Sequence, residues 1–301
     1  MVGGGRYDVI DADPPRRRGP GWLGAVVVVG LIAVPVAVVM LGRGDGAGPP
    51  AATTATPRPA LSVIETRPNA LVPEPRRAGR DAEAVDVTFP DGSRARVSYP
   101  ARLGLAALGV RPAIGVRHAA WDGFRILYAP LEGEAEIAAG GQRLRRLTDD
   151  VSLWPQRAGR DGGYVTVFRF GRWILAMDEP RGDGVAFDER MDLARHVRGT
   201  VPRRGFLVLR AGGPVTLGRP GETYGDAPVG PQLWFGGVGG RVVVLAPTPG
   251  CDARSPMPAI VTGQGYTAKT CKGDMLVAVG AERWFAQRVL KGIEVRAMGG
   301  G

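Results

Sequence analysis

Few residues of this chain could carry out nucleophilic catalysis. A serine hydrolase needs a serine, a histidine and a carboxylate in contact, and only two histidines occur, His118 and His196. The serines are Ser62, Ser93, Ser98, Ser152 and Ser255. None of them lies in a Gly-x-Ser-x-Gly motif. His118 is close in sequence to Asp122, so an imidazole and a carboxylate could meet there. We interpret both histidines as structural and predict no catalytic residue.

Carboxylates are the other candidates for chemistry. Glu132, Glu134 and Glu136 alternate along a segment that we predict to be a strand, so their side chains would share one face. Paired carboxylates can act in acid–base catalysis or bind a hard cation. Alternating charges are more often the solvated side of a strand, and we expect neither a metal nor a cofactor. An enzymatic role would need these glutamates to cluster beside a tryptophan-lined cleft.

Aromatic side chains are the strongest candidates for ligand binding in the sequence. Five tryptophans are spread evenly through the predicted folded region: Trp121, Trp154, Trp173, Trp234 and Trp284. Even spacing favours core anchors over a single exposed stacking platform. Two or three of them exposed together would form a groove for a polysaccharide or a peptide. We therefore keep all five as weak binding candidates.

An uncharged apolar stretch at residues 23–41 organises the rest of the chain. A helix of this length spans roughly the 30 Å of a bilayer's hydrocarbon core. Arg16, Arg17 and Arg18 precede it, which favours a cytoplasmic amino terminus. A cleaved secretory signal is the competing interpretation, but its apolar core is shorter, roughly 7 to 15 residues. We predict an uncleaved single-pass anchor in the cell membrane.

This anchor divides the chain into further regions. We predict a cytoplasmic tail at 1–22, the transmembrane helix at 23–42 and a Pro-rich flexible linker at 43–83. The remainder would be extracellular. Cys251 and Cys271 both fall there, and an oxidising compartment favours a disulfide between them. Closing a loop of that length stabilises by about 3 kcal/mol in the chain-entropy model.

The formal net charge of +10 at pH 7 narrows the choice of partners. A nucleic-acid binder could carry this charge, but a location outside the membrane argues against nucleic acid. Attraction to anionic lipids or wall polymers fits better, although salt would weaken it. A solvated, mildly basic surface is the other interpretation. The expected partners are the lipid bilayer, through the anchor helix, and a cell-wall polymer or another envelope protein.

The folded region should be rich in turns and antiparallel strands, because glycine and proline make up about a quarter of the chain. Alternating residues flanking a Pro-Asp-Gly-Ser turn predict a hairpin over 84–99. We predict a helix capped by Asp188, with Phe187, Met191, Ala194 and Val197 on one face, and a second helix at 281–291. Strands are predicted at 124–128, 134–138, 142–147, 151–154, 164–170, 172–177, 206–210, 232–235, 241–246, 275–279 and 293–296.

Two sequence echoes suggest an internal repeat. Residues 125–130 resemble 242–247, and some forty residues later a Gly-led strand precedes Arg172-Trp173 in one half and Arg283-Trp284 in the other. We predict an α+β extracytoplasmic region built of two duplicated halves with one helix each. The halves would cover 84–201 and 202–301, the second carrying the disulfide. One continuous domain is the alternative.

A short part of this region resembles a known group of proteins. The matching motifs are Val-Thr-Phe-Pro-Asp-Gly at 87–92, Val-Ser-Tyr-Pro at 97–100, Leu105 and Leu-Gly-Val-Arg-Pro at 108–112. This pattern resembles uncharacterised membrane-anchored extracytoplasmic proteins of actinobacteria. The resemblance covers about thirty residues and implies lineage and location, with no activity to carry over.

The sequence therefore predicts a single-pass, membrane-anchored extracytoplasmic protein. Its expected role is a non-enzymatic interaction or sensor module of the cell envelope. One alternative is a carboxylate-dependent enzyme acting on envelope glycans. Another is a structural partner of a second membrane protein, which an apolar exposed face would favour.

Overall fold

The computed structural model describes residues 68–156, 162–182 and 184–299. They belong to one compact unit, Ser62–Gly301. No helix within these residues is long and apolar enough to cross a membrane. The predicted tail, the transmembrane helix and most of the linker, with Arg16, Arg17 and Arg18, lie outside the described residues.

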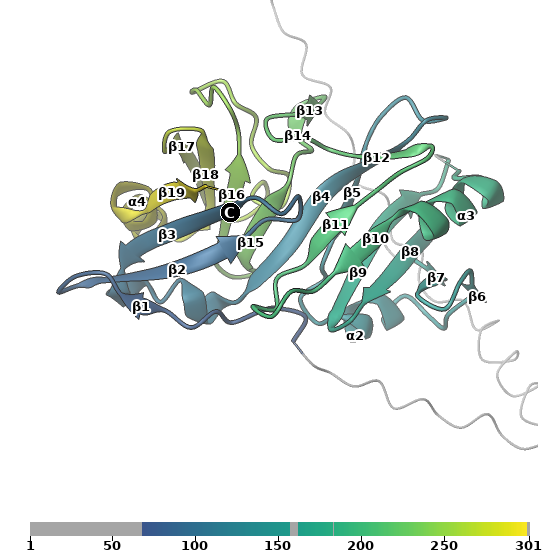
Figure 1. Cartoon of the computed structure of the whole chain (residues 1–301), viewed down its shortest axis with the longest axis horizontal. Helices are drawn as coiled ribbons and strands as arrows, with labels where there is room; N and C mark the ends of the chain where they lie inside the picture. Colours follow the sequence, from purple (N-terminus) through teal and green to yellow (C-terminus); the bar gives the residue numbers. More distant parts are fainter. Residues whose placement is uncertain (1–67, 157–161, 183, 300–301) are drawn as a thin grey trace, which may run out of the picture. The chain divides into compact units, whose positions relative to one another are not determined.

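An eleven-stranded antiparallel sheet forms the centre of the described region (Figure 1). Across the sheet the strands are β17 (Tyr266–Cys271), β18 (Met275–Ala281), β16 (Val242–Pro247), β15 (Gln232–Gly236), β4 (Val110–His118), β5 (Arg125–Tyr128), β9 (Trp173–Pro180), β8 (Gly163–Phe170), β7 (Val151–Pro155) and β6 (Arg145–Arg146). A further strand, β12 (Val215–Leu217), pairs with β4. The prediction of an antiparallel, sheet-rich fold with few helices is confirmed.

A smaller sheet has the order β1-β2-β3-β19. Its strands are β1 (Arg76–Arg77), β2 (Ala82–Thr88), β3 (Arg94–Pro100) and β19 (Glu294–Met298). The predicted hairpin is confirmed as β2 and β3, because Val85, Val87 and Val97 alternate inward while Asp86 and Arg96 point outward. Two-stranded pairs join β10 (Arg198–Thr200) to β11 (Val208–Arg210), and β13 (Thr223–Tyr224) to β14 (Ala227–Pro228).

Three α-helices lie among the described residues: α2 (Glu134–Ala138), α3 (Phe187–His196) and α4 (Arg283–Gly292). Two single 3-10 turns, η1 (Ala101–Leu103) and η2 (Ala106–Leu108), follow β3. Both long helices were predicted, but one detail of α3 was wrong. Its N-cap is Ala186 and not Asp188. The N–H of Ala186 donates to the Glu189 carboxylate. Phe187 is exposed, because the buried face of α3 begins at Leu193.

The predicted strand at 134–138 is also wrong. These residues form α2, which begins after Gly133 at a positive φ of 59°. A five-residue run with one buried side chain, Ile137, carries too little periodicity to separate a short helix from a strand. Alternate residues of a helix point about 200° apart, so Glu134 and Glu136 do not share a face.

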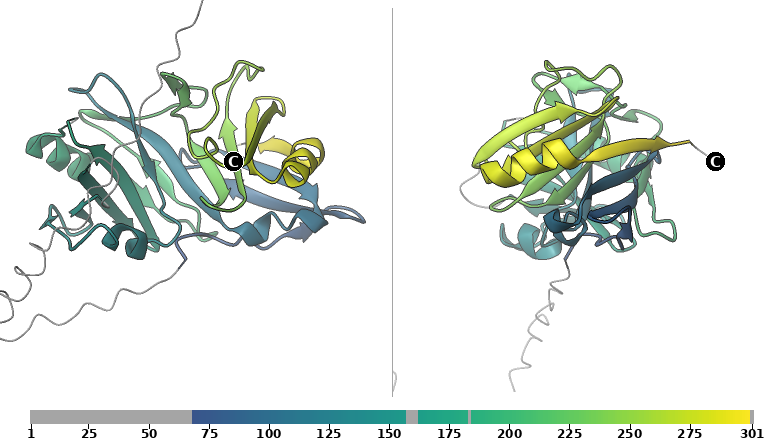
Figure 2. Two further views of the ribbon diagram at one scale, coloured as in Figure 1. Left: turned by 180° about the vertical axis from the view of Figure 1, so that it is seen from behind. Right: turned by 90° about the vertical axis from the view of Figure 1, so that its left-hand side faces the viewer.

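Both faces of the long sheet are covered. On one face, α4 and the four-stranded sheet pack over β15, β16 and β18 around Phe285, while α3 and the β10–β11 pair pack over β5, β8 and β9 around Trp173. The other face carries a cluster around Trp234 and another around Ile137 of α2. The left view of Figure 2 shows this arrangement from behind.

Strand order is mirrored about the β4–β15 pair. Outward from this pair, one side reads β4-β5-β9-β8 and the other reads β15-β16-β18-β17. In each series a helix follows the third strand of the sheet order, and a short strand follows the helix. Each short strand pairs across the predicted boundary at residues 201–202, β10 with β11 and β19 with β3.

Candidate functional site

The five predicted tryptophans do not converge on one cleft. Trp154, Trp173 and Trp234 are buried in three different clusters. Their indole N–H groups donate to Ser152 Oγ, Gly205 O and Gln232 Oε1, respectively. Trp121 is half-buried and donates to Glu189 Oε2 of α3 at 3.1 Å. These four rings act as anchors between elements, since each is packed and its polar atom is satisfied.

Trp284 differs from the others, because 47% of it is exposed. It is the second residue of α4, whose buried side consists of Phe285, Ala286 and Val289. A step of one residue turns a helix by about 100°, so anchoring Phe285 in the core directs Trp284 outward. The core therefore fixes an exposed indole on a rigid helix.

Arginines surround this indole. Arg241 immediately precedes β16. Its guanidinium carbon lies 4.9 Å from the centre of the Trp284 ring and 4.5 Å from the centre of the Phe285 ring. Arg288, one turn along α4, lies 5.4 Å from the Trp284 ring. Arg283 lies over Tyr266 at 5.0 Å. We name Trp284, Arg241, Arg283, Arg288 and Tyr266 the Trp284 surface.

Only one carboxylate balances these arginines within the described part of the surface. Glu282 accepts from Arg241 Nε at 3.0 Å, and this hydrogen bond lowers the pKa of Glu282. Arg283 opens the helix without an acidic residue in the first turn, where the helix dipole disfavours a cation. The Trp284 surface therefore has a net positive charge, although a cation in the first turn of α4 does not stabilise the helix.

A shallow groove of about 670 Å³ borders the Trp284 surface. Two glycine-rich loops at 236–240 and 263–265 form its rim, and Gly239 N donates to Gln264 Oε1 across them at 3.3 Å. Val238 at the tip of the first loop is 72% exposed. An aromatic face flanked by guanidiniums and an amide can stack on a sugar ring or an apolar group while binding nearby anions.

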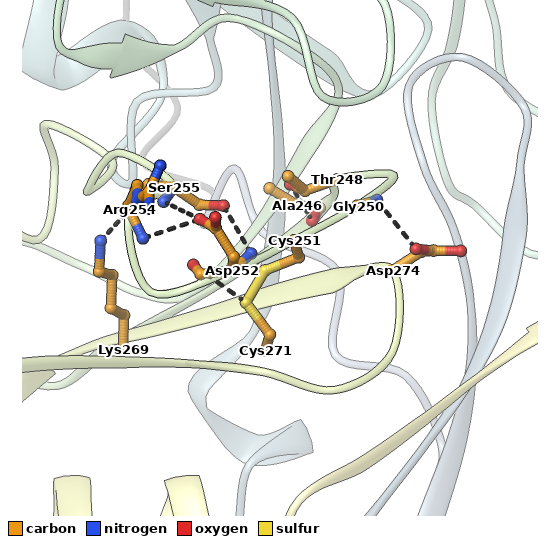
Figure 3. Close-up of a disulfide and its surroundings, with 10 residues drawn as sticks. All are labelled: Ala246, Thr248, Gly250, Cys251, Asp252, Arg254, Ser255, Lys269, Cys271 and Asp274. Carbon is orange, nitrogen blue, oxygen red and sulfur yellow. Dashed lines mark hydrogen bonds between the residues drawn. A yellow bond between two sulfur atoms is a disulfide. The ribbon is translucent and has the colours of Figure 1, made fainter.

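The predicted disulfide between Cys251 and Cys271 is present, with the two Cα atoms 5.8 Å apart. It fastens the loop after β16 to β17 (Figure 3). Gly250 N donates to Asp274 Oδ1, and the Lys269 ammonium donates to Ser255 O, so the same loop is held at three points. The segment that follows supplies Val261 to the cluster around Trp234. This disulfide therefore has a structural role.

His118 meets a carboxylate, although not the one suggested by the sequence. Its Nε2 lies 3.3 Å from Asp192 Oδ2 on α3, whereas Asp122 is exposed on the loop after β4. Because Ala120 N donates to His118 Nδ1, the proton is assigned to Nε2, which donates to Asp192. The Nδ1 of His196 contacts Asp192 O within the same helix. Only the pairing of β4 with β12 and the packing of α3 could reveal this contact.

The three glutamates also separate. Glu134 pairs with Arg169 at 2.5 Å, whereas Glu136 lines a pocket of about 150 Å³ that contains Tyr128 and Ile137 but no tryptophan. Glu132 is exposed, and its N–H lies 3.4 Å from Glu136 Oε2. Within the described ranges, no group of three metal-ligating side chains is present. The enzymatic alternative requires clustered glutamates beside a tryptophan-lined cleft. Around the described Glu132, Glu134 and Glu136 we find neither.

No protein-family model, curated protein or solved structure matches the chain. The resemblance to actinobacterial extracytoplasmic proteins therefore stays a prediction from sequence.

Proposed function

We propose that this chain is a single-pass, membrane-anchored extracytoplasmic protein that serves as a non-enzymatic interaction module of the cell envelope. Its apolar stretch at 23–41 would be the anchor, with the amino terminus cytoplasmic and the folded region outside. The observation that carries the proposal is the exposed Trp284 held between Arg241 and Arg288. Exposed tryptophan and arginine are the residue types most enriched where proteins bind their partners.

Comparison of the two long helices supports this choice of surface. Two of the three carboxylates of α3 are used internally, since Glu189 accepts from Trp121 and Asp192 contacts His118, while Asp188 is exposed. On α4 the exposed residues are instead three cations, Trp284 and the neutral Gln287, and none is acidic. The two helices occupy matching places in the mirrored strand order. Both helices pack on the sheet, but only α4 presents a tryptophan flanked by arginines to solvent.

We also propose that the mirrored order reflects two duplicated halves, at 84–201 and 202–301. The exchange of β10 and β19 between the halves would explain how both fold as one unit. After a duplication one copy is free to diverge. The opposite net charges of α3 and α4 would be such a divergence, and the cationic α4 would be the helix that binds the ligand.

The proposed ligand is an anionic polymer of the cell wall. The Trp284 ring would stack on a sugar face, while the surrounding arginines would attract carboxylate or phosphate groups. Charge alone gives binding that salt abolishes, whereas a stacked ring keeps part of its contribution in salt. Salt resistance therefore distinguishes a built surface from diffuse attraction.

The test mixes the full-length chain, in nonionic detergent, with isolated cell wall at low and high salt. We expect salt-resistant binding that Trp284→Ala weakens about tenfold, as loss of a central aromatic contact should. Phe187→Ala is the matched control, because Phe187 is 48% exposed and lies under Arg145 at 4.4 Å, outside the Trp284 surface. Equal binding by both variants, or binding that salt abolishes, would contradict the proposal.

A further inference from the structure

The outer face of the four-stranded sheet carries a groove of about 930 Å³. Its floor is formed by β3 and β19, and its walls by the turn before β2 and by η1. The right view of Figure 2 shows β19 continuing from α4. This groove does not include the residues of the Trp284 surface.

Two arginines lie directly opposite one another on this floor. Arg96 of β3 and Arg296 of β19 are register partners, so their side chains leave the same face of adjacent strands. Like charges placed directly opposite on a sheet are unfavourable. Both guanidiniums have carboxylate neighbours, Asp86 for Arg96 and Glu294 for Arg296. Asp86 is shared with Arg204 at 3.4 Å, so it balances only one of its two arginines.

Arginines also stand on the walls of the groove. Arg80 and Arg102 line it, both are exposed, and neither forms an ion pair with another described residue. Against these four lining guanidiniums the lining contains two carboxylates, Asp81 and Glu294. The groove therefore has an excess of about two positive charges, together with the half-buried Ser98 hydroxyl on its floor.

We propose that this groove binds a phosphate-bearing ligand. Guanidinium groups bind phosphate oxygens in a bidentate manner, and a phosphate monoester carries about −1.5 to −2 charges at pH 7, which matches the excess of the lining. A bound phosphate between Arg96 and Arg296 would remove their mutual repulsion. The groove is much larger than one phosphate, so it has room for the group that carries it.

The test titrates the full-length chain, in nonionic detergent, with glycerol 3-phosphate and with phosphatidate in mixed micelles. We expect binding that Arg80→Gln/Arg102→Gln weakens about tenfold. The control Arg143→Gln/Arg210→Gln removes the same charge from exposed positions outside the groove and should stay within about twofold. Preference for one probe identifies a soluble or a lipid source, and either preference supports the site.

A second variant guards against a merely structural explanation. Arg296→Gln removes one of the two opposed charges, so it should raise the melting temperature of the ligand-free chain at low salt while weakening binding of both probes. Equal losses in the groove and control variants would mean diffuse charge and would overturn the proposal. Failure of both probes to bind would also overturn it.

Discussion

The ion pair between Glu179 and Arg190 joins the long sheet to α3 and offers a sharp test of the packing. Glu179 at the end of β9 is 1% exposed. Its Oε2 accepts from Arg190 Nη2 at 2.6 Å and from Nε at 3.0 Å. Its other oxygen accepts from the buried Thr166 hydroxyl. Both oxygens of the carboxylate are therefore satisfied inside the protein.

Arg190→Met should be strongly destabilising. The methionine keeps an aliphatic side chain against Tyr164, over which Arg190 lies at 5.4 Å, but it leaves the Glu179 carboxylate buried without its cation. Breaking a buried pair in this way costs about 3 to 5 kcal/mol. For a domain of this size each kcal/mol lowers the melting temperature by about 2–4 °C, so a fall of roughly 10 °C is expected.

The double variant Glu179→Gln/Arg190→Met separates charge from packing. Glutamine keeps an acceptor for Thr166 and removes the unpaired charge, so the double variant should recover about 2 kcal/mol relative to Arg190→Met alone. Urea unfolding of the full-length chain, followed by tryptophan fluorescence, measures both variants. A loss below about 1 kcal/mol for Arg190→Met, or no recovery in the double variant, would refute the reasoning.

Three further predictions concern stability. Replacing both Cys251 and Cys271 by serine should lower the free energy of unfolding by about 3 kcal/mol, and reduction of the wild type should reproduce that loss in a urea titration. Burial raises the pKa of Tyr99 to about 12, against about 10 when unfolded, so its stability contribution is complete below pH 10 and is lost as the pH rises through 12. At pH 11 this amounts to roughly 1 kcal/mol, and Tyr99→Phe should show a correspondingly smaller fall in urea midpoint between pH 9 and pH 11. Gly109→Ala should cost about 1–3 kcal/mol in thermal unfolding, because its φ is 73° and a Cβ would lie 2.9 Å from Ala70 Cβ, whereas Gly104→Ala, with φ of 56° and open space, should cost less. Equal costs for the two glycines would show that the close approach of Ala70 has no effect.

Local signals in the sequence predicted the elements that depend on them. The alternation on either side of the 90–93 turn predicted β2 and β3, and the helix predicted at 281–291 is present as α4. The Cys251–Cys271 pair was predicted from the expected compartment and needed no knowledge of the fold. Each of these rests on periodicity, turn chemistry or residue type within a short window.

Features that depend on non-local pairing were missed. The last strand was predicted, but not its pairing with β3, which brings Arg296 opposite Arg96 and forms the floor of the groove. The partner of His118 was sought four residues away and is Asp192, on a helix that packs against this part of the sheet. Sequence separation is no guide to distance in an antiparallel sheet whose strand order is not sequential.

The sequence also could not predict which aromatic side chains of a helix are exposed. Trp284 and Phe285 are adjacent aromatic residues, yet Trp284 is 47% exposed and Phe285 is buried, and only the packing decides which ring faces the core. The arginines that mark the Trp284 surface come from α4 and from the residue before β16. Pairing of β16 with β18 brings them together.

We propose that Trp284 is the contact through which this protein binds the cell wall. Oxidative footprinting of the full-length chain, with and without isolated wall, measures the solvent access of each aromatic side chain directly. We expect the wall to protect Trp284 from oxidation severalfold, while Phe187, similarly exposed at 48%, is oxidised at an unchanged rate. Unchanged oxidation of Trp284 on wall-bound protein would contradict it.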